Sequence, residues 1–183
     1  MSATYERIEG TFRDFIEAQK MFFVATAALS AEGTVNLSPK GYDSLRILDE
    51  TTVAYADLGG SGVETMAHVR ENGRITLMFV AFDGAPNIVR LHGKGVVTAF
   101  EDEGFAEQLA LFPGLTRARS VIRVDVQRIS DSCGWGVPFF DFRGERDQLR
   151  RWVDHRDEQT WRERRYASNA LSIDGLPGLT RPK

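Results

Sequence analysis

Apolar and polar residues alternate in short runs along most of this chain, and turn-forming residues separate the runs. Two runs, 21–29 and 74–82, are apolar on both faces, which predicts buried central strands. Other runs carry apolar residues at every second position, which predicts strands with one face toward a core. We expect these further strands at 34–41, 45–48, 52–58, 88–100 and 120–130.

Helical spacing of apolar residues marks the remaining elements, which we expect at 11–19, 61–72, 102–112 and 145–165. The order is therefore a helix, four strands, a helix, two strands, a helix, a strand and a C-terminal helix. Six or seven strands joined mostly by hairpins favour a mainly β protein with flanking helices, an α+β fold. They predict an antiparallel barrel rather than a parallel doubly wound sheet.

Composition and charge narrow the class of protein. A chain of 183 residues with 42% hydrophobic and 27% charged residues describes one soluble globular domain. The net charge of −3 indicates neither a nucleic-acid nor a membrane partner. The apolar runs are too short to span a membrane, and residues 1–20 lack the character of a signal peptide. The single cysteine, Cys133, excludes an internal disulfide, so we expect a cytoplasmic location, and no residue spacing predicts a metal site.

The segment "NLSPKGYD" is the first candidate for chemistry. Its alternation places Asn36, Ser38 and Lys40 on one face of a strand. Pro39 cannot donate a ladder hydrogen bond, and Gly41 frees the backbone directly after the lysine. Two interpretations remain open: an ordinary strand end at the surface, or one wall of a ligand site.

The segment "GGSG" at 59–62 is the second candidate, because it enters the helix expected at 61–72. Free N–H groups at a helix N-terminus attract a phosphate. Ser61 followed by Glu64 also fits a capping box, which would explain the motif without any ligand. Both interpretations stay open at this point.

A third polar feature lies on the strand expected at 88–100, where Arg90, His92 and Lys94 share a face. Each of them has an ordinary interpretation as a solvated or hydrogen-bonded side chain. The late helix carries many arginines interleaved with Asp and Glu, which is typical of an exposed, salt-bridged face.

Taken in order, the motifs "FFVATA", "VNLSPKG", "TVAYADLGGSGVETMAHVRENGRITLMF", "IVRLHGKG" and "CGWGVP" resemble the pyridoxamine 5′-phosphate oxidase-like flavoproteins. The resemblance covers residues 12–142 and is greatest to the FMN-binding branch rather than to the true oxidases. It implies a six- to seven-stranded antiparallel split β-barrel that forms a homodimer, with FMN at the interface.

The resemblance also implies which residues bind the cofactor. "VNLSPK" corresponds to a flavin-lining strand, and "DLGGSGVET" to a phosphate segment. Arg90 corresponds to a flavin-facing strand position, and Trp135 to a residue that reaches the flavin from the partner subunit. The implied cofactor-binding set is Asn36, Leu37, Ser38, Pro39, Lys40, Gly41, Asp57, Gly60, Ser61, Gly62, Thr65, Arg90 and Trp135.

Two departures from the oxidases matter. Those enzymes place two adjacent basic residues at the phosphate, where this chain has Val63, Glu64 and Thr65. Phosphate binding would then rest on N–H groups and hydroxyls, aided by Lys40 or Arg90. The C-terminal arginine-histidine signature for substrate is not clear either, so we do not predict oxidation of pyridoxamine phosphate.

The leading hypothesis is an FMN-binding oxidoreductase that exchanges hydride or electrons with NAD(P)H or a small molecule. Lys40 is the candidate to stabilise reduced flavin, and no residue is assigned a catalytic proton transfer. A deazaflavin- or haem-binding protein and a non-catalytic flavin-binding stress-response protein are the alternatives. One domain, 1–183, is expected: an N-terminal helix at 1–20, a barrel with two helices at 21–133, and a flavin-covering loop, charged helix and tail at 134–183.

Overall fold

The barrel is a single antiparallel sheet in a computed structural model that describes residues 4–181. Its strands are β1 (Thr4–Tyr5), β2 (Phe22–Ala27), β3 (Val35–Lys40), β4 (Leu45–Ile47), β5 (Thr52–Asp57), β6 (Arg74–Val80), β7 (Ile88–Ala99) and β8 (Ser120–Ser132). They run in the order β3-β2-β6-β7-β8-β5-β4, and the short β1, which the alternation did not predict, pairs with β8.

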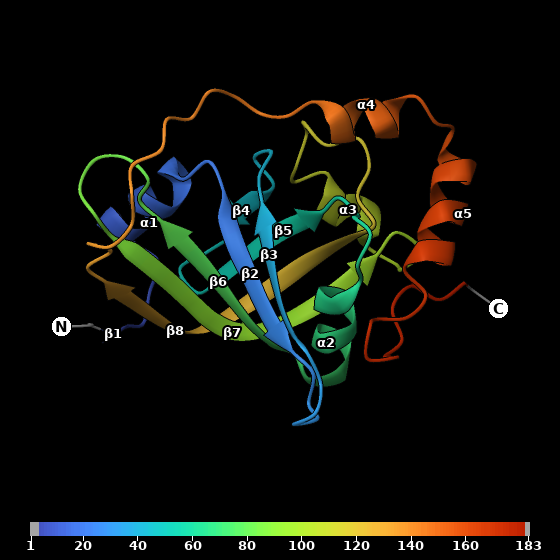
Figure 1. Cartoon of the computed structure of the whole chain (residues 1–183), viewed down its shortest axis with the longest axis horizontal. Helices are drawn as coiled ribbons and strands as arrows, with labels where there is room; N and C mark the ends of the chain where they lie inside the picture. Colours follow the sequence, from blue (N-terminus) through green and yellow to red (C-terminus); the bar gives the residue numbers. More distant parts are fainter. Residues whose placement is uncertain (1–3, 182–183) are drawn as a thin grey trace.

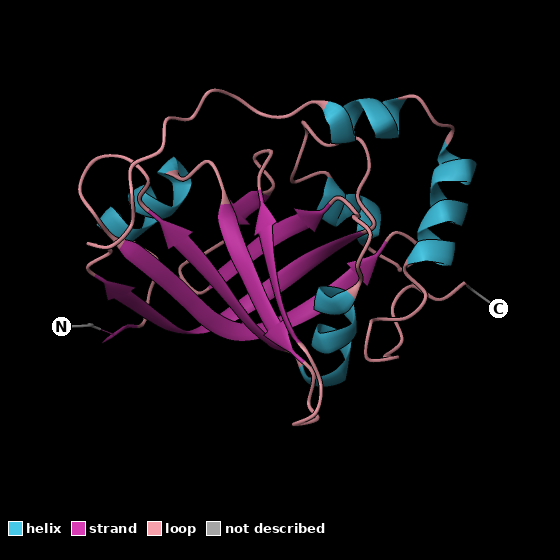
Figure 2. Cartoon of the chain, viewed as in Figure 1, coloured by secondary structure: helices cyan, strands magenta, loops and turns pink. Residues whose placement is uncertain are grey.

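The sheet curls on itself without closing, so β3 and β4 are left as its two edges (Figure 2). This confirms the expected antiparallel split barrel. The loop at 41–44 joins the two edges and needs an unusual backbone: Tyr42 and Asp43 have φ of 66° and 51°, in the left-handed region. The chain therefore crosses the split of the barrel directly after Lys40.

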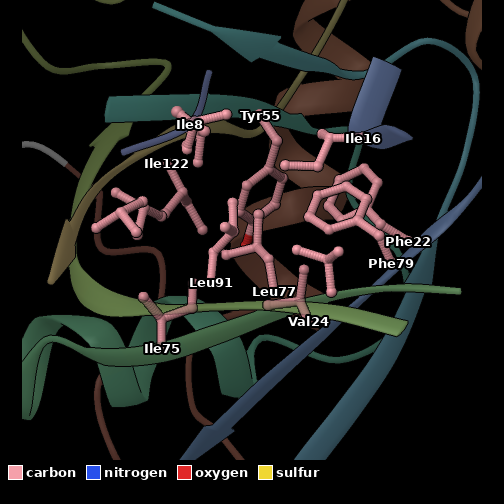
Figure 3. Packing of buried hydrophobic residues seen from close by; sticks show 14 of the residues in the cluster. Ile8, Ile16, Phe22, Val24, Tyr55, Ile75, Leu77, Phe79, Leu91 and Ile122 are labelled. Carbon is pink, nitrogen blue, oxygen red and sulfur yellow. The ribbon is translucent and has the colours of Figure 1, made fainter. Parts of the chain in front are cut away.

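One large hydrophobic cluster fills the curled sheet (Figure 3). Tyr55, Leu77 and Leu91 reach its centre from three different strands and are fully buried. Ile16 of α1 (Gly10–Ala18) and the stacked rings of Phe22 and Phe79 extend the cluster toward one end. This packing is what fixes the register of β2 and β3, and so which β3 side chains face inward.

The other helices are α2 (Glu64–Asn72), α3 (Phe105–Leu109), α4 (Gln148–Asp154) and α5 (Glu158–Ser168). The prediction of one helix over 145–165 is wrong, because the chain breaks it between α4 and α5. The side chain of Asp157 accepts a hydrogen bond from the backbone N–H of Thr160 and so starts a new helix. Within residues 4–181, no helix is both long and apolar enough to cross a bilayer.

The C-terminal part of the chain crosses the barrel before it reaches these two helices. After β8, an extended segment runs from the α1 side across one end of the molecule to α4 (Figure 1). Trp161 and Tyr166 of α5 then pack on Phe100, which follows β7. The C-terminal part is thus anchored beside the connection between β5 and α2.

Candidate functional site

The polar face of β3 lies where the alternation predicts it. Asn36, Ser38 and Lys40 are half-buried, while Leu37 and Pro39 between them are exposed. Ser38 is paired across the ladder with Val24, a fully buried core residue of β2. The polar face therefore points to the inner side of the sheet, at the margin of the core.

Asn36 ties this face to the start of α2. Its amide nitrogen donates to the Thr65 hydroxyl at 2.8 Å and to the Thr26 hydroxyl at 3.2 Å. Its oxygen accepts from the Ser38 hydroxyl at 2.9 Å. Both Thr26 and Thr65 are buried, so these bonds are shielded from competing water. Asn36, Ser38 and Thr65, separated in the sequence, meet in one network.

Lys40 meets a buried carboxylate at the end of β5. Its ammonium lies 3.2 Å from the Oδ1 atom of Asp57, and the Arg119 guanidinium lies 2.9 Å from Oδ2. The Asp57 and Arg119 side chains are only 2% and 4% exposed. Because β3 and β5 lie on opposite sides of the split, this cluster links the two sides of the open barrel.

The charges around Asp57 settle its ionisation. Burial alone would raise the pKa of this carboxyl group, but the Arg119 guanidinium and the Lys40 ammonium outweigh it. Together they hold the pKa of Asp57 well below its ordinary value. The carboxylate is therefore charged throughout the neutral range.

Two arginines hydrogen-bond the backbone carbonyl groups of the loop at 59–62. The Gly60 carbonyl accepts a hydrogen bond of 2.7 Å from Arg165 of α5, and the Gly62 carbonyl accepts one from Arg119. Gly59 has a φ of 82°, and a Cβ atom there would lie 3.2 Å from the Arg165 side chain. The N–H groups of 60–62 have no acceptor within residues 4–181, and these three residues are exposed.

The start of α2 corrects the capping interpretation. The helix begins at Glu64 with Val63 as its N-cap, and no side chain caps it. Ser61 is therefore not an N-cap, and the capping box is wrong. The Glu64 carboxylate instead folds over Gly62 and accepts a hydrogen bond of 3.3 Å from the backbone N–H of Ile173 in the C-terminal tail.

A cavity of about 540 Å³ lies between these segments. It is lined by Thr34, Val35, Asn36, Leu37, Ser61, Gly62, Glu64, Leu171, Ser172 and Ile173. Predicted residues from β3 and from the glycine-rich loop thus share one cavity, with the tail as its third wall. A second cavity of about 280 Å³ adjoins Pro39, Lys40 and Gly41, and residues of the 142–146 segment line its other side.

Arg90 and Trp135 do not join this cavity within one chain. Arg90 pairs across the ladder with Met78 of β6, Met78 pairs with Phe23 of β2, and Phe23 pairs with Pro39 of β3. Paired residues lie on the same face of a sheet, so Arg90 lies on the outer face. Its guanidinium donates to the Ser132 hydroxyl at 3.0 Å. Trp135 is 82% exposed, in the segment after β8.

Sequence reasoning missed three residues that bind the loop: Arg119, Arg165 and Asn169. The side-chain amide nitrogen of Asn169 lies 3.3 Å from the Ser61 carbonyl oxygen. No local signal distinguishes them: Arg119 stands among other arginines, and Arg165 lies in a helix full of charges. Only the fold brings them to the loop, from positions 57 to 108 residues away.

The family model and a curated relative indicate the same family. Residues 8–133 match the family model described as pyridoxamine 5′-phosphate oxidase. A protein of Aspergillus flavus, the pyridoxamine 5′-phosphate oxidase family protein ustO, is 35% identical over 197 aligned residues, covering 98% of this chain and 78% of that protein. Among solved structures, HupZ of Group A Streptococcus has a TM-score of 0.56 at 25% identity, over 68% of this chain and 99% of that chain. An FMN-binding protein of Syntrophomonas wolfei has a TM-score of 0.48 at 16% identity, over 62% of this chain and 77% of that chain.

The Asp57 cluster makes a testable contribution to stability. Asp57→Asn leaves the buried Arg119 and the half-buried Lys40 without their carboxylate, so we expect the free energy of unfolding at neutral pH to fall by roughly 3 kcal/mol or more. The depressed pKa means that the carboxylate stabilises the fold above its ordinary pKa of about 4 and loses this effect as pH falls through the folded-state value. In urea unfolding, the difference in the free energy of unfolding between wild type and variant should therefore become smaller at acid pH.

Asp43→Asn is the matched control for this measurement, because Asp43 is an exposed carboxylate that also pairs with an arginine. Its effect should stay within about 0.5 kcal/mol. An Asp57→Asn effect as small as that of the control, or one that does not change between neutral and acid pH, would contradict the assigned role.

Proposed function

Because the chain belongs to the pyridoxamine 5′-phosphate oxidase family, we propose that it is a flavoprotein that binds FMN and acts as an oxidoreductase. The electron donor or acceptor is NAD(P)H or another small molecule. The proposal includes a homodimer with the flavin at its interface and a cytoplasmic location, in keeping with the lone, unpaired Cys133.

The observation that carries the proposal is the convergence of β3 with the 59–62 loop around one cavity. The free N–H groups of the loop suit a phosphate, and the polar face of β3 offers side chains along an extended ligand. Lys40 stands at the far end of this face, next to the second cavity. The phosphate would bind at the loop, and the ring system would lie toward Lys40.

The charges beneath the loop offset the missing basic pair. Arg119 and Arg165 hydrogen-bond the loop carbonyls, and Asp57 balances one of their two positive charges. This surplus lies on the carbonyl side of the loop and attracts an anion to its N–H side. Glu64 works against the anion, but its hydrogen bond with the tail gives its carboxylate another partner.

The protein's part in the chemistry follows from these positions. FMN, when bound, supplies the hydride chemistry itself. Lys40 would stabilise negative charge on the ring system, while Asp57 keeps the lysine side chain in place by a partly buried ion pair. Asn36, Ser38 and Thr65 would orient the cofactor.

A second copy of the chain would complete the site. The outward side of edge strand β3 is apolar, with Val35 and Leu37 exposed by 76% and 63%. Such an edge invites a partner. In a dimer across this face, Trp135 of one protomer would reach the flavin bound mainly by the other, as the family resemblance implies. We propose the same for Arg90, because it lies on the outer face of the sheet.

Flavin binding is tested by purifying the protein, recording its visible spectrum and titrating the apoprotein with FMN. Lys40→Ala and Ser61→Ala should each weaken FMN binding, by about tenfold for the lysine, because each removes a polar group assigned to the ligand. Lys94→Ala is the control, since Lys94 is an exposed lysine on β7. A colourless protein that ignores added FMN, or unchanged affinity in both variants, would reject the assignment.

Catalysis needs a separate readout. The FMN-loaded protein, mixed with NADH or NADPH without oxygen, should lose its flavin absorbance. A bound flavin that neither donor bleaches, nor any of a panel of small reductants, would favour the non-catalytic alternative. Mass spectrometry of the co-purified ligand distinguishes FMN from a deazaflavin or haem.

The dimer is tested by Leu37→Glu, which places a charge on the exposed apolar side of β3. We expect the variant to be monomeric by light scattering, because the charge would have to be buried against the partner. Leu29→Glu changes a similarly exposed leucine outside the strands and should leave the dimer intact. A monomeric wild type, or a Leu37→Glu variant that still dimerises, would contradict the interface.

A further inference from the structure

A fully buried histidine lies directly behind the polar face of β3. His68 belongs to α2, and its side chain has no exposed surface. Its Nδ1 atom lies 3.1 Å from the Thr26 hydroxyl. Its Nε2 atom has no hydrogen-bond partner among the described residues and lies 3.8 Å from the Oδ2 atom of Asp174 in the tail.

Asp174 decides which ring nitrogen carries the proton. The carboxylate accepts from the backbone N–H of Thr34 at 2.9 Å and from its hydroxyl at 2.8 Å. These bonds hold the pKa of Asp174 below its ordinary value, so it is ionised at neutral pH. An N–H at Nε2 is attracted by this carboxylate, whereas a lone pair there would be repelled. This geometry favours the tautomer with its hydrogen at Nε2, in which Nδ1 is the acceptor.

The tautomer sets the direction of every bond up to the cavity. Since Nδ1 accepts, the Thr26 hydroxyl donates to it and receives the Asn36 amide N–H at 3.2 Å in return. The second hydrogen of that amide goes to Thr65. Both amide hydrogens of Asn36 are thus directed inward, away from any ligand.

Asn36, which lines the cavity, and its neighbour Ser38 on the polar face of β3 are left with acceptors only. The Asn36 oxygen takes one bond, from Ser38, and keeps a lone pair. The Ser38 hydroxyl has spent its hydrogen on Asn36, so it too can only accept. A group that docks against this pair must donate hydrogen bonds, as the hydroxyls of a polyol chain do and a phosphate does not.

We propose that His68 is a positioning residue that, with Asp174 and Thr26, orients Asn36 so that β3 accepts hydrogen bonds from the polyol part of the ligand. The inference rests on the proposed function, in which that polyol is the ribityl chain of FMN. It gives the C-terminal tail a role in ligand recognition, since Asp174 lies about a hundred residues beyond His68 in the sequence.

The experiment compares two flavins that differ in the polyol. Riboflavin carries the ribityl chain without the phosphate. Lumiflavin carries a methyl group in place of the whole ribityl chain. Thr26→Val removes the linking hydroxyl at nearly constant volume, and Thr26→Ser keeps it. We expect Thr26→Val to weaken riboflavin binding by about tenfold in fluorescence titrations and to leave lumiflavin unchanged. Thr26→Ser should restore riboflavin binding to nearly the wild-type value.

Asp174→Asn tests the other end of the chain, because it removes the charge that faces His68 while an amide oxygen can still accept from Thr34. Like Thr26→Val, it should weaken riboflavin binding, here by several-fold, and leave lumiflavin binding unchanged. Thr98→Val is the matched control: Thr98 is a buried threonine whose hydroxyl accepts from Gln108, away from the cavity. Its ratio of riboflavin to lumiflavin affinity should equal that of the wild type.

The outcomes separate this inference from the proposed function. A wild type that binds neither FMN nor riboflavin overturns both. A wild type that binds riboflavin, together with Thr26→Val and Asp174→Asn variants that bind it equally well, overturns the role of His68 and leaves the flavoprotein standing. Equal loss of riboflavin and lumiflavin in Thr26→Val also overturns it, because that result indicates only a structural defect.

Discussion

The buried carboxylate of Asp57 is the contact on which the arrangement of the site depends. The split barrel has two free edges, and the chain crosses between them through a loop with two left-handed residues. Lys40 at the end of one edge strand and Arg119 directly before β8 both pair with Asp57. Because the carboxylate has low exposure and two cationic partners, losing either ion pair is costly. The two walls of the cavity are therefore kept at a constant spacing.

The C-terminal part of the chain extends this arrangement beyond the barrel. Arg165 in α5 and Asn169 at the C-terminal end of that helix donate hydrogen bonds to carbonyls of the 59–62 loop. The tail that follows forms one wall of the cavity. These residues lie after the segment 8–133 that matches the family model. The shared barrel thus supplies the β3 face and the loop, and the C-terminal part binds the loop's carbonyl groups.

The sequence predicted what depends on local pattern. Alternation located β3 and its polar face, and motif order indicated the family and the split barrel. The capping box failed because Glu64 finds a partner in the tail, 109 residues away. The charged helix was predicted too long, although Asp157 followed by Thr160 is a local start signal. Arg119, Arg165 and His68 could not be found, because their roles arise from contacts between distant segments.

A crystal structure of the protein grown with FMN would locate the ligand. We expect the phosphate against the N–H groups of 60–62, the ribityl chain along Asn36 and Ser38, and the ring system toward Lys40. This placement would be contradicted by FMN that contacts neither the 59–62 loop nor β3, for example in the separate cavity of about 290 Å³ between α1 and β4.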